Sequence, residues 1–261
     1  MSFLEEFEAK TRHEVAKRPW MSSVTMLRVI DVEMLRAVVD ECIASGLYAL
    51  DIETTGLDNR VFNGRTVAQI VGFSLSPDGE RGYYIPIRHA VDEGNLPIPL
   101  VEAELNRLAE SAAIAIFHNA KFDQEFLQFA GIGTWDDPRK FEDTLLLTWL
   151  RNTRQKVKNL KFMSLMELKM EMIELRELWP PEYDGPKDFS TLDPTWDPVI
   201  WYACSDAICT YRLFKVLHPQ VMAPNGDKSK GQPIVYNIEK MVVGATRWME
   251  RCRVYIDQPK V

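Results

Sequence analysis

The sequence has 261 residues, of which 46% are hydrophobic and 26% charged, and its formal net charge at pH 7 is -7. This composition is typical of a globular protein with one large domain, or with one domain and an appendage. The negative charge argues against a protein that coats polyanions through a broad basic face. It does not exclude a nuclease, because an enzyme that holds a few nucleotides at bound cations needs positive charge only locally.

Neither a membrane segment nor a disulfide framework is expected. No apolar run is long enough to cross a bilayer, and residues 1–20 lack the hydrophobic core of a signal peptide. We therefore expect a cytoplasmic protein with no membrane partner. The cysteines form no C-x-x-C pair, which predicts buried free thiols at Cys42, Cys204, Cys209 and Cys252.

Helical and strand patterns alternate along the chain. The apolar spacing predicts helices over residues 3–17, 31–45, 100–112, 119–130, 141–150, 160–178, 197–214 and 234–251. Strands are predicted over residues 47–52, 66–76, 81–87 and 114–117. The first three strands favour an antiparallel meander, and the later alternation favours parallel additions. The predicted fold class is therefore α/β, with a mixed central sheet flanked by helices.

The stretch LYALDIETTGLD, residues 47–58, places two acids at the end of a buried strand. Side chains at i and i+2 of a strand share one face, so Asp51 and Glu53 stand side by side while Leu50 and Ile52 point into the core. Two close carboxylates repel one another, and a hard divalent cation such as magnesium relieves that repulsion. The alternative is an exposed edge strand with solvated acids, which the apolar run before Asp51 makes less favourable.

Two later motifs offer further acids. In HNAKFDQ, Asn119 is placed to cap a helix and Asp123 lies in its first turns, where it either complements the helix dipole or points toward the acidic strand. In YACSDA, Tyr202 and Asp206 share one helix face, as a surface hydrogen-bonding pair or as part of a metal site. Asp143 or Thr144 is expected to cap the helix over residues 141–150, and Asp143 is interpreted as mainly structural. The basic run over residues 151–161 is either a solvated face or a phosphate contact.

Together, D-x-E, N-x-x-x-D and Y-x-x-x-D in this order resemble the DEDDy exonucleases, with Tyr202 in the position that distinguishes this branch. The phrases DIETTGLD, FHNAKFD, EDTLLLTWL and YACSDA are similar to the proofreading domain of family A DNA polymerases of the bacterial polymerase I type. The resemblance covers residues 26–218 and implies an RNase H-like fold. Residues 238–257 are similar to the segment that joins this domain to the polymerase, although Arg253 stands where glycine is usual.

The resemblance also implies a site with two divalent ions, Mg²⁺ or Mn²⁺. By this likeness Asp51 bridges both ions, Glu53 and Asp206 hold the first, and Asp123 binds the second largely through water. Tyr202 and Glu53 would orient the attacking water. The substrate-binding positions implied in the same way are Thr54, Leu57, Asn119 and Phe189, with Leu57 as a wedge against the terminal base and Phe189 as a stacking residue.

These features predict a 3'-5' exodeoxyribonuclease that acts in proofreading during DNA replication on a single-stranded or frayed 3' end. A polymerase domain is an expected partner, in the same chain or a separate one. The expected organisation is an extension over residues 1–22, an exonuclease domain over 23–225, and a linker with the start of a polymerase region over 226–261. Two alternatives stay open, an RNase D-like 3'-5' exoribonuclease and a non-catalytic scaffold that binds nucleic acid.

Overall fold

The acidic strand, β2 (Leu47–Thr54), lies in the middle of a six-stranded sheet. The computed structural model describes residues 18–58, 61–62, 65–185, 187–227 and 231–252, so the expected helix over residues 3–17 and the phrase around Arg253 lie outside them. In sheet order the strands are β1 (Thr25–Arg28), β6 (Arg81–Pro86), β5 (Ile70–Ser76), β2, β7 (Ile114–Phe117) and β8 (Phe141–Asp143).

The sheet is mixed, as the sequence predicts. β2, β5 and β6 pair antiparallel, whereas β7 joins β2 in parallel and β8 joins β7 in parallel. β1, which was not predicted, pairs in parallel with β6 at one edge. A separate hairpin of β3 (Val61–Phe62) and β4 (Arg65–Thr66), also unpredicted, follows β2.

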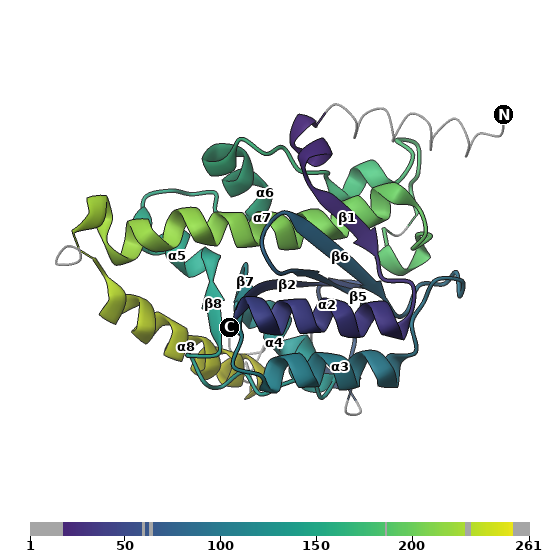
Figure 1. Ribbon diagram of the computed structural model, residues 1–261, viewed down its shortest axis with the longest axis horizontal. Helices are drawn as coiled ribbons and strands as arrows, with labels where there is room; N and C mark the ends of the chain where they lie inside the picture. The colour runs from purple at the N-terminus through teal and green to yellow at the C-terminus, as the bar shows by residue number, and fades with distance from the viewer. Residues whose placement is uncertain (1–17, 59–60, 63–64, 186, 228–230, 253–261) are drawn as a thin grey trace, which may run out of the picture.

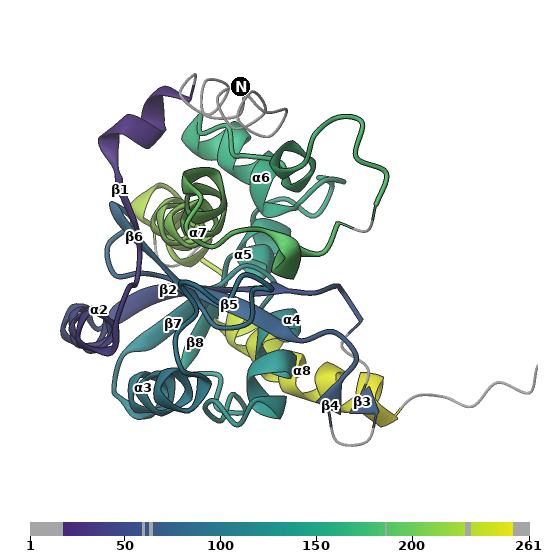
Figure 2. The ribbon, with the colours of Figure 1, turned by 90° about the vertical axis from the view of Figure 1, so that its right-hand side faces the viewer.

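Helices cover both faces of the sheet (Figure 1). On one face lie α2 (Val32–Ser45), α3 (Ile98–Glu110) and α4 (Ala120–Phe129), and on the other α7 (Asp197–Met222), with α5 (Thr144–Arg151) packed beside it. Figure 2 shows these layers with the sheet between them. The ends of α2 follow the sequence: the Asp31 carboxylate accepts the Met34 N–H at 2.7 Å, and Gly46 ends the helix at φ 70°.

The alternation of β2 divides its side chains between these two layers. Tyr48, Leu50 and Ile52 belong to the core on the α2 and α3 face, whereas Ala49 belongs to the core beneath α7. Asp51 and Glu53 have the same strand parity as Ala49 and therefore face α7.

The predicted helix over residues 160–178 is wrong. Only α6 (Leu160–Met163) is α-helical; a π-helical turn, η2 (Ser164–Leu168), follows, and Lys169 then adopts a left-handed conformation with φ 59° that ends it. The chain continues through buried Met170, Met172 and Ile173 to the 3-10 turn η3 (Leu175–Leu178). Packing of these apolar side chains against two parts of the core outweighs helix propensity here.

Two further sequence predictions need correction. Residues 141–143 form strand β8 rather than the start of a helix, and Asp143 caps the helix α5 that follows. Among the cysteines, Cys42, Cys204 and Cys209 are buried free thiols as expected, but Cys252 is exposed. In the described part of the chain, no helix is long and apolar enough to span a membrane.

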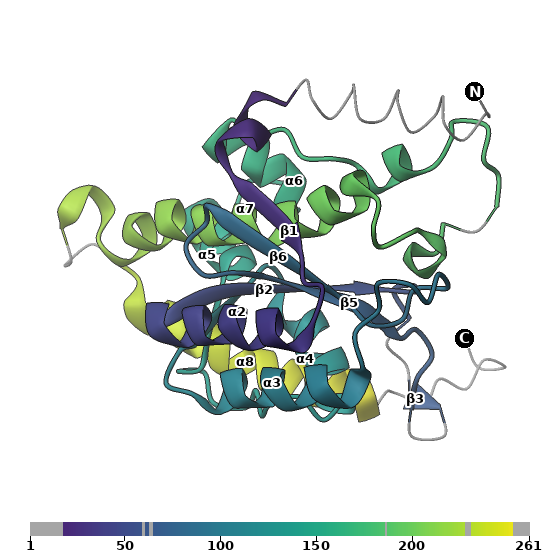
Figure 3. The same ribbon diagram turned by 45° about the vertical axis from the view of Figure 1, so that its right-hand side comes forward.

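The last described helix, α8 (Pro233–Cys252), packs against α4 and α5 (Figure 3). Its buried face is largely polar, with Tyr236, Lys240 and Arg247 turned inward beside Val243. The predicted boundary at residue 226 stays a prediction, but α8 contacts the same body that carries the acids. The remaining short turns are η1 (Pro19–Ser23), η4 (Phe189–Thr191) and η5 (Pro224–Gly226).

Candidate active site

Helix α7 crosses the sheet directly above the acidic face of β2. It contacts β2, β5 and β6, and its residues Ala203, Cys204, Ala207 and Ile208 are buried. The close approach depends on Gly82 in β6, because a Cβ atom there would lie 2.7 Å from the Cβ of Cys204. One turn of α7 therefore brings Tyr202 and Asp206 to the sheet.

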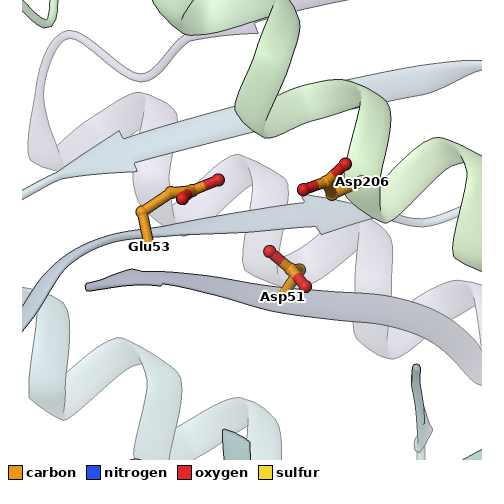
Figure 4. A group of neighbouring side chains, drawn as sticks. All are labelled: Asp51, Glu53 and Asp206. Atoms are coloured by element: carbon orange, nitrogen blue, oxygen red, sulfur yellow. The ribbon is translucent and has the colours of Figure 1, made fainter. Parts of the chain in front are cut away.

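Three carboxylates meet between β2 and α7. One ligand oxygen from each of Asp51, Glu53 and Asp206 lies within 4.8 Å of the others. Figure 4 shows the two β2 side chains and the α7 side chain converging on one space. Glu53 Oε1 and Asp206 Oδ1 are buried and have no hydrogen-bond partner among the described residues. Buried carboxylate oxygens without donors fit a divalent cation, which accepts oxygen ligands and offsets their charge.

The electrostatics of the three acids are those of crowded anions. Burial, followed by the neighbouring Asp206, raises the pKa of Asp51 and that of Glu53 well above their usual values. Burial also raises the pKa of Asp206 to about 6. Three buried carboxyls with raised pKa values at one place repel one another and cost stability, which replacement of one acid by a neutral residue would relieve. Such clusters are typical of functional sites.

The fourth acid, Asp123, lies next to this group but not in it. Its carboxylate is buried at the start of α4, and the backbone of Ile52 acts to lower its pKa. Burial is the main cause of its raised pKa, and its charge in turn raises the pKa of Asp51. Asp123 therefore lies within electrostatic reach of the carboxylate group.

Tyr202 lies beside the acids in a buried aromatic cluster. Its ring is 5.7 Å from the ring of Phe189, which in turn contacts His89 and Tyr84. Burial, and then the charge of Asp206, raises the pKa of the Tyr202 phenol well above its usual value. The hydroxyl therefore stays protonated at neutral pH, so that it can donate a hydrogen bond but is a poor base.

Comparison with known proteins assigns the family. A family model for the DNA polymerase A type, described as 3'-5' exonuclease, matches residues 29–222. The chain belongs to this 3'-5' exonuclease family. A curated relative, DNA polymerase I of Rhizobium leguminosarum, is 28% identical over 235 residues, which cover 82% of this chain and 22% of the relative. The chain thus spans about a fifth of the length of that polymerase.

Solved structures share the fold of this exonuclease. Brucella melitensis NrnC bound to pGG has a TM-score of 0.57 at 18% identity, covering 90% of this chain and 98% of NrnC. The catalytic core of RRP6 from Trypanosoma brucei has a TM-score of 0.58 at 14% identity, covering 85% of this chain and 52% of that one. These likenesses agree with the RNase H-like fold predicted from the sequence.

The predicted substrate-binding residues of the exonuclease lie in different surroundings. Leu57 is 83% exposed in the turn after β2, whereas Phe189 is 2% exposed with its ring against Tyr202. The Thr54 hydroxyl donates to the Gly56 carbonyl at 2.7 Å and so shapes this turn. The structure therefore brings Leu57 and Thr54 to the end of the acidic strand but places Phe189 inside the core.

Asn119 does not cap α4 as the sequence predicts. It occupies the N-cap position in a left-handed conformation with φ 75°, and its side chain makes no cap hydrogen bond. The cap comes instead from Asp143, whose carboxylate accepts the N–H groups of Asn119 and Ala120 at 3.0 and 2.9 Å. A carboxylate can satisfy several backbone donors at once, which leaves the Asn119 amide uninvolved in this cap.

Sequence reasoning missed one charged residue at the site. Lys161, on α6, lies with its ammonium 4.4 Å from the centroid of the Tyr202 ring. Lys161 belongs to the basic run over residues 151–161, and nothing in that run distinguishes it from the other lysines and arginines. Other members are engaged elsewhere: Arg151 pairs with Glu167, and Lys158 lies over the Trp149 ring.

Proposed function

We propose that this 3'-5' exonuclease hydrolyses DNA from a single-stranded or frayed 3' end, using two divalent metal ions, and releases nucleoside 5'-monophosphates. The observation that carries the proposal is the group formed by Asp51, Glu53 and Asp206, whose ligand oxygens lie within 4.8 Å of one another. Asp123 stands beside it on α4. Such a set supplies oxygen ligands from two directions, as a site for two ions about 4 Å apart requires.

The residues of the chain divide the work in this proposal. Glu53 and Asp206 would hold one ion, Asp51 would contact both, and Asp123 would hold the other largely through water. When bound, the ions would activate the water nucleophile and stabilise the charge on the leaving 3' oxygen. Tyr202 donates a hydrogen bond that orients the water, because its raised pKa keeps the proton on the phenol.

The direction of digestion tests the proposal. Single-stranded DNA labelled at its 5' end is incubated with the 261-residue chain and Mg²⁺, and we expect a ladder that shortens from the 3' end. The same strand labelled at its 3' end should release labelled mononucleotide at once. Ladders that shorten from the 5' end, or no digestion at all in Mg²⁺ or Mn²⁺, would show that the proposal is wrong.

Two carboxamide variants separate the metal site from general charge loss. Glu53→Gln should lower the rate by about 100-fold or more, the scale of losing a group that positions the reacting water. Glu80→Gln is the matched control, since Glu80 is exposed in the turn before β6. Equal rates for Glu53→Gln and wild type would remove Glu53 from the site.

The choice of nucleic acid is a separate measurement. DNA and RNA oligonucleotides of the same sequence are compared at one Mg²⁺ concentration, and we expect faster digestion of the DNA. Faster digestion of RNA would favour the exoribonuclease alternative. Binding of an oligonucleotide without cleavage would favour the scaffold alternative, which the presence of all four acids argues against.

We also propose that the exonuclease works in proofreading beside a polymerase domain, in this chain or a separate one. The match to about a fifth of a DNA polymerase I supports this partner. A primer-template with mismatched 3' nucleotides should then be digested faster than a fully paired one. Equal rates on both ends would contradict a proofreading role while leaving the nuclease activity in place.

A further inference from the structure

Lys161 places a positive charge beside the carboxylate group. Its ammonium donates to the Ile173 carbonyl at 2.7 Å, lies 3.9 Å from the Glu174 carboxylate, and sits 4.4 Å from the Tyr202 ring centroid. The side chain is 22% exposed, so the charge is held at the margin of the site. These three contacts fix the ammonium from different directions.

The backbone around Lys161 is arranged to hold it there. The left-handed Lys169 turns the chain back after the π-helical turn, and this brings Ile173 and Glu174 alongside α6. A continuous helix over residues 160–178 would instead carry Ile173 about 18 Å along the axis from Lys161, out of hydrogen-bond reach. The end of the helix at Lys169, which the sequence did not predict, therefore creates the binding position of the Lys161 ammonium.

The charge of Lys161 reaches each member of the carboxylate group. Lys161 contacts Tyr202, one turn of α7 before Asp206, and its charge acts to lower the pKa of Asp51, Glu53 and Asp206, against the raising effect of burial. At the same time its ammonium contacts the face of Tyr202, a geometry in which a cation attracts an aromatic ring. One side chain thus contacts the residue that orients water and balances the residues that would hold metal.

We propose that Lys161 is a positioning residue of the exonuclease site, which holds the Tyr202 ring in place and partly balances the charge of the carboxylate group. The proposal rests on the function proposed above. Removing the charge of Lys161 should therefore have two effects of opposite sign, one on hydrolysis and one on the attraction for cations. Tyr202 loses its support, which slows hydrolysis, while the carboxylate group becomes more negative, which strengthens its attraction for cations.

The first test compares Lys161→Met with Lys161→Arg in the 261-residue chain. Methionine keeps the length of the side chain without its charge, and we expect kcat on single-stranded DNA to fall about 10-fold to 100-fold, the scale of a misplaced catalytic group. Arginine keeps the charge and stacks on aromatic rings, so it should recover much of the rate. The matched control is Lys215→Met, because Lys215 lies on the exposed side of α7.

The second test asks whether Lys161 acts through Tyr202. Each single variant and the double variant are measured in a cycle with Tyr202→Phe. The phenylalanine has no hydroxyl to position, so Lys161→Met should cost much less in that background than in wild type. Equal losses in both backgrounds, or a Lys161→Met variant with the wild-type kcat, would overturn the proposal.

The third test needs no nuclease activity. The rise in Tm is measured over a series of Mn²⁺ concentrations without DNA, and we expect Lys161→Met to reach a given rise at a Mn²⁺ concentration at least about 3-fold lower than wild type does. General damage to the site would instead raise this concentration, and an unchanged or raised value would overturn the charge-balancing role. If wild type fails to digest DNA, the proposed function is wrong, whereas this titration still decides the role of Lys161.

Discussion

The carboxylate of Asp143 accepts the backbone N–H of Ala120 at 2.9 Å and thereby joins two helix N-termini. The same carboxylate accepts the N–H of Leu145 at 2.8 Å in its own helix, α5. Asp143 is 2% exposed, and its own backbone N–H donates to the Tyr236 hydroxyl of α8. One buried acid outside the carboxylate group therefore fixes the start of α4, the helix that presents Asp123.

Replacing Asp143 by alanine should affect both stability and catalysis. The change leaves three N–H groups without their acceptor, and we expect a loss of about 3 kcal/mol in the free energy of unfolding by urea. Asp31→Ala is the control, because Asp31 caps α2 alone and its loss should cost about 1 kcal/mol. Only Asp143→Ala should also slow the nuclease, since only it releases Asp123; equal nuclease rates in the two variants would refute this link.

Helix α8 supports α4 from the other side. Arg247 is 3% exposed and donates to Gln124 at 2.8 Å and to Gln128 at 2.6 Å, both on α4. Arg247→Leu leaves the buried Gln124 amide oxygen without its donor, whereas Gln128 keeps Arg251, so we expect the free energy of unfolding to fall by about 1–3 kcal/mol. Met249→Gln, on the exposed face of α8, should change it by less than about 0.5 kcal/mol. A small effect of Arg247→Leu would mean that α8 contributes little to the exonuclease fold.

His118 predicts a response to acid. Its ring lies between the Thr144 hydroxyl at 2.8 Å and the Lys158 carbonyl at 3.0 Å, and burial lowers its pKa from 6.5 to about 4. A group with a lowered folded pKa binds its proton more readily when unfolded, so the folded state loses stability as pH falls from about 6.5 to about 4.

We expect His118→Gln to remove part of this acid sensitivity. Unfolding by urea is measured for wild type and variant from pH 7.5 to 4.5, and the gap between them should close by about 1–2 kcal/mol as pH falls. The difference is used because burial raises the pKa of the site carboxyls, which shifts stability in the opposite sense. A gap that is constant with pH would show that His118 does not titrate in this range.

Local pattern was enough to predict the centre of the site. The alternation of β2 places Asp51 and Glu53 on one face, and a spacing of four places Tyr202 and Asp206 on one face of α7. The antiparallel meander also follows from its turn residues. These features depend on neighbours in sequence, which is why the residues themselves reveal them.

The parts that failed depend on residues far apart in the chain. β1 and β8 have only 4 and 3 residues, and pairing with β6 and β7 rather than a local pattern makes them strands. The position of the Lys161 ammonium depends on the left-handed conformation of Lys169, which no local pattern requires of lysine. The cap of α4 comes from Asp143, 23 residues after Ala120, so the sequence pointed to Asn119 instead.

Leu57 and Phe189 were both predicted to contact the terminal bases, and their surroundings now predict different outcomes. Phe189 fills the core against Tyr202, so Phe189→Ala should lower the free energy of unfolding by about 3–5 kcal/mol. Leu57 is exposed, so Leu57→Ala should leave stability within about 0.5 kcal/mol of wild type.

The effect of Leu57→Ala should show instead in the binding of single-stranded DNA. An exposed apolar side chain in the turn after the acidic strand can pack on a terminal base, and base stacking of this kind is worth about 1–3 kcal/mol. We therefore expect KM for single-stranded DNA to rise about 5-fold or more, with kcat changed much less. The measurement is steady-state digestion of 5'-labelled strands, with Val67→Ala, another exposed apolar residue after β2, as the control. An unchanged KM for Leu57→Ala, or an equal rise for both variants, would show that Leu57 is not a wedge.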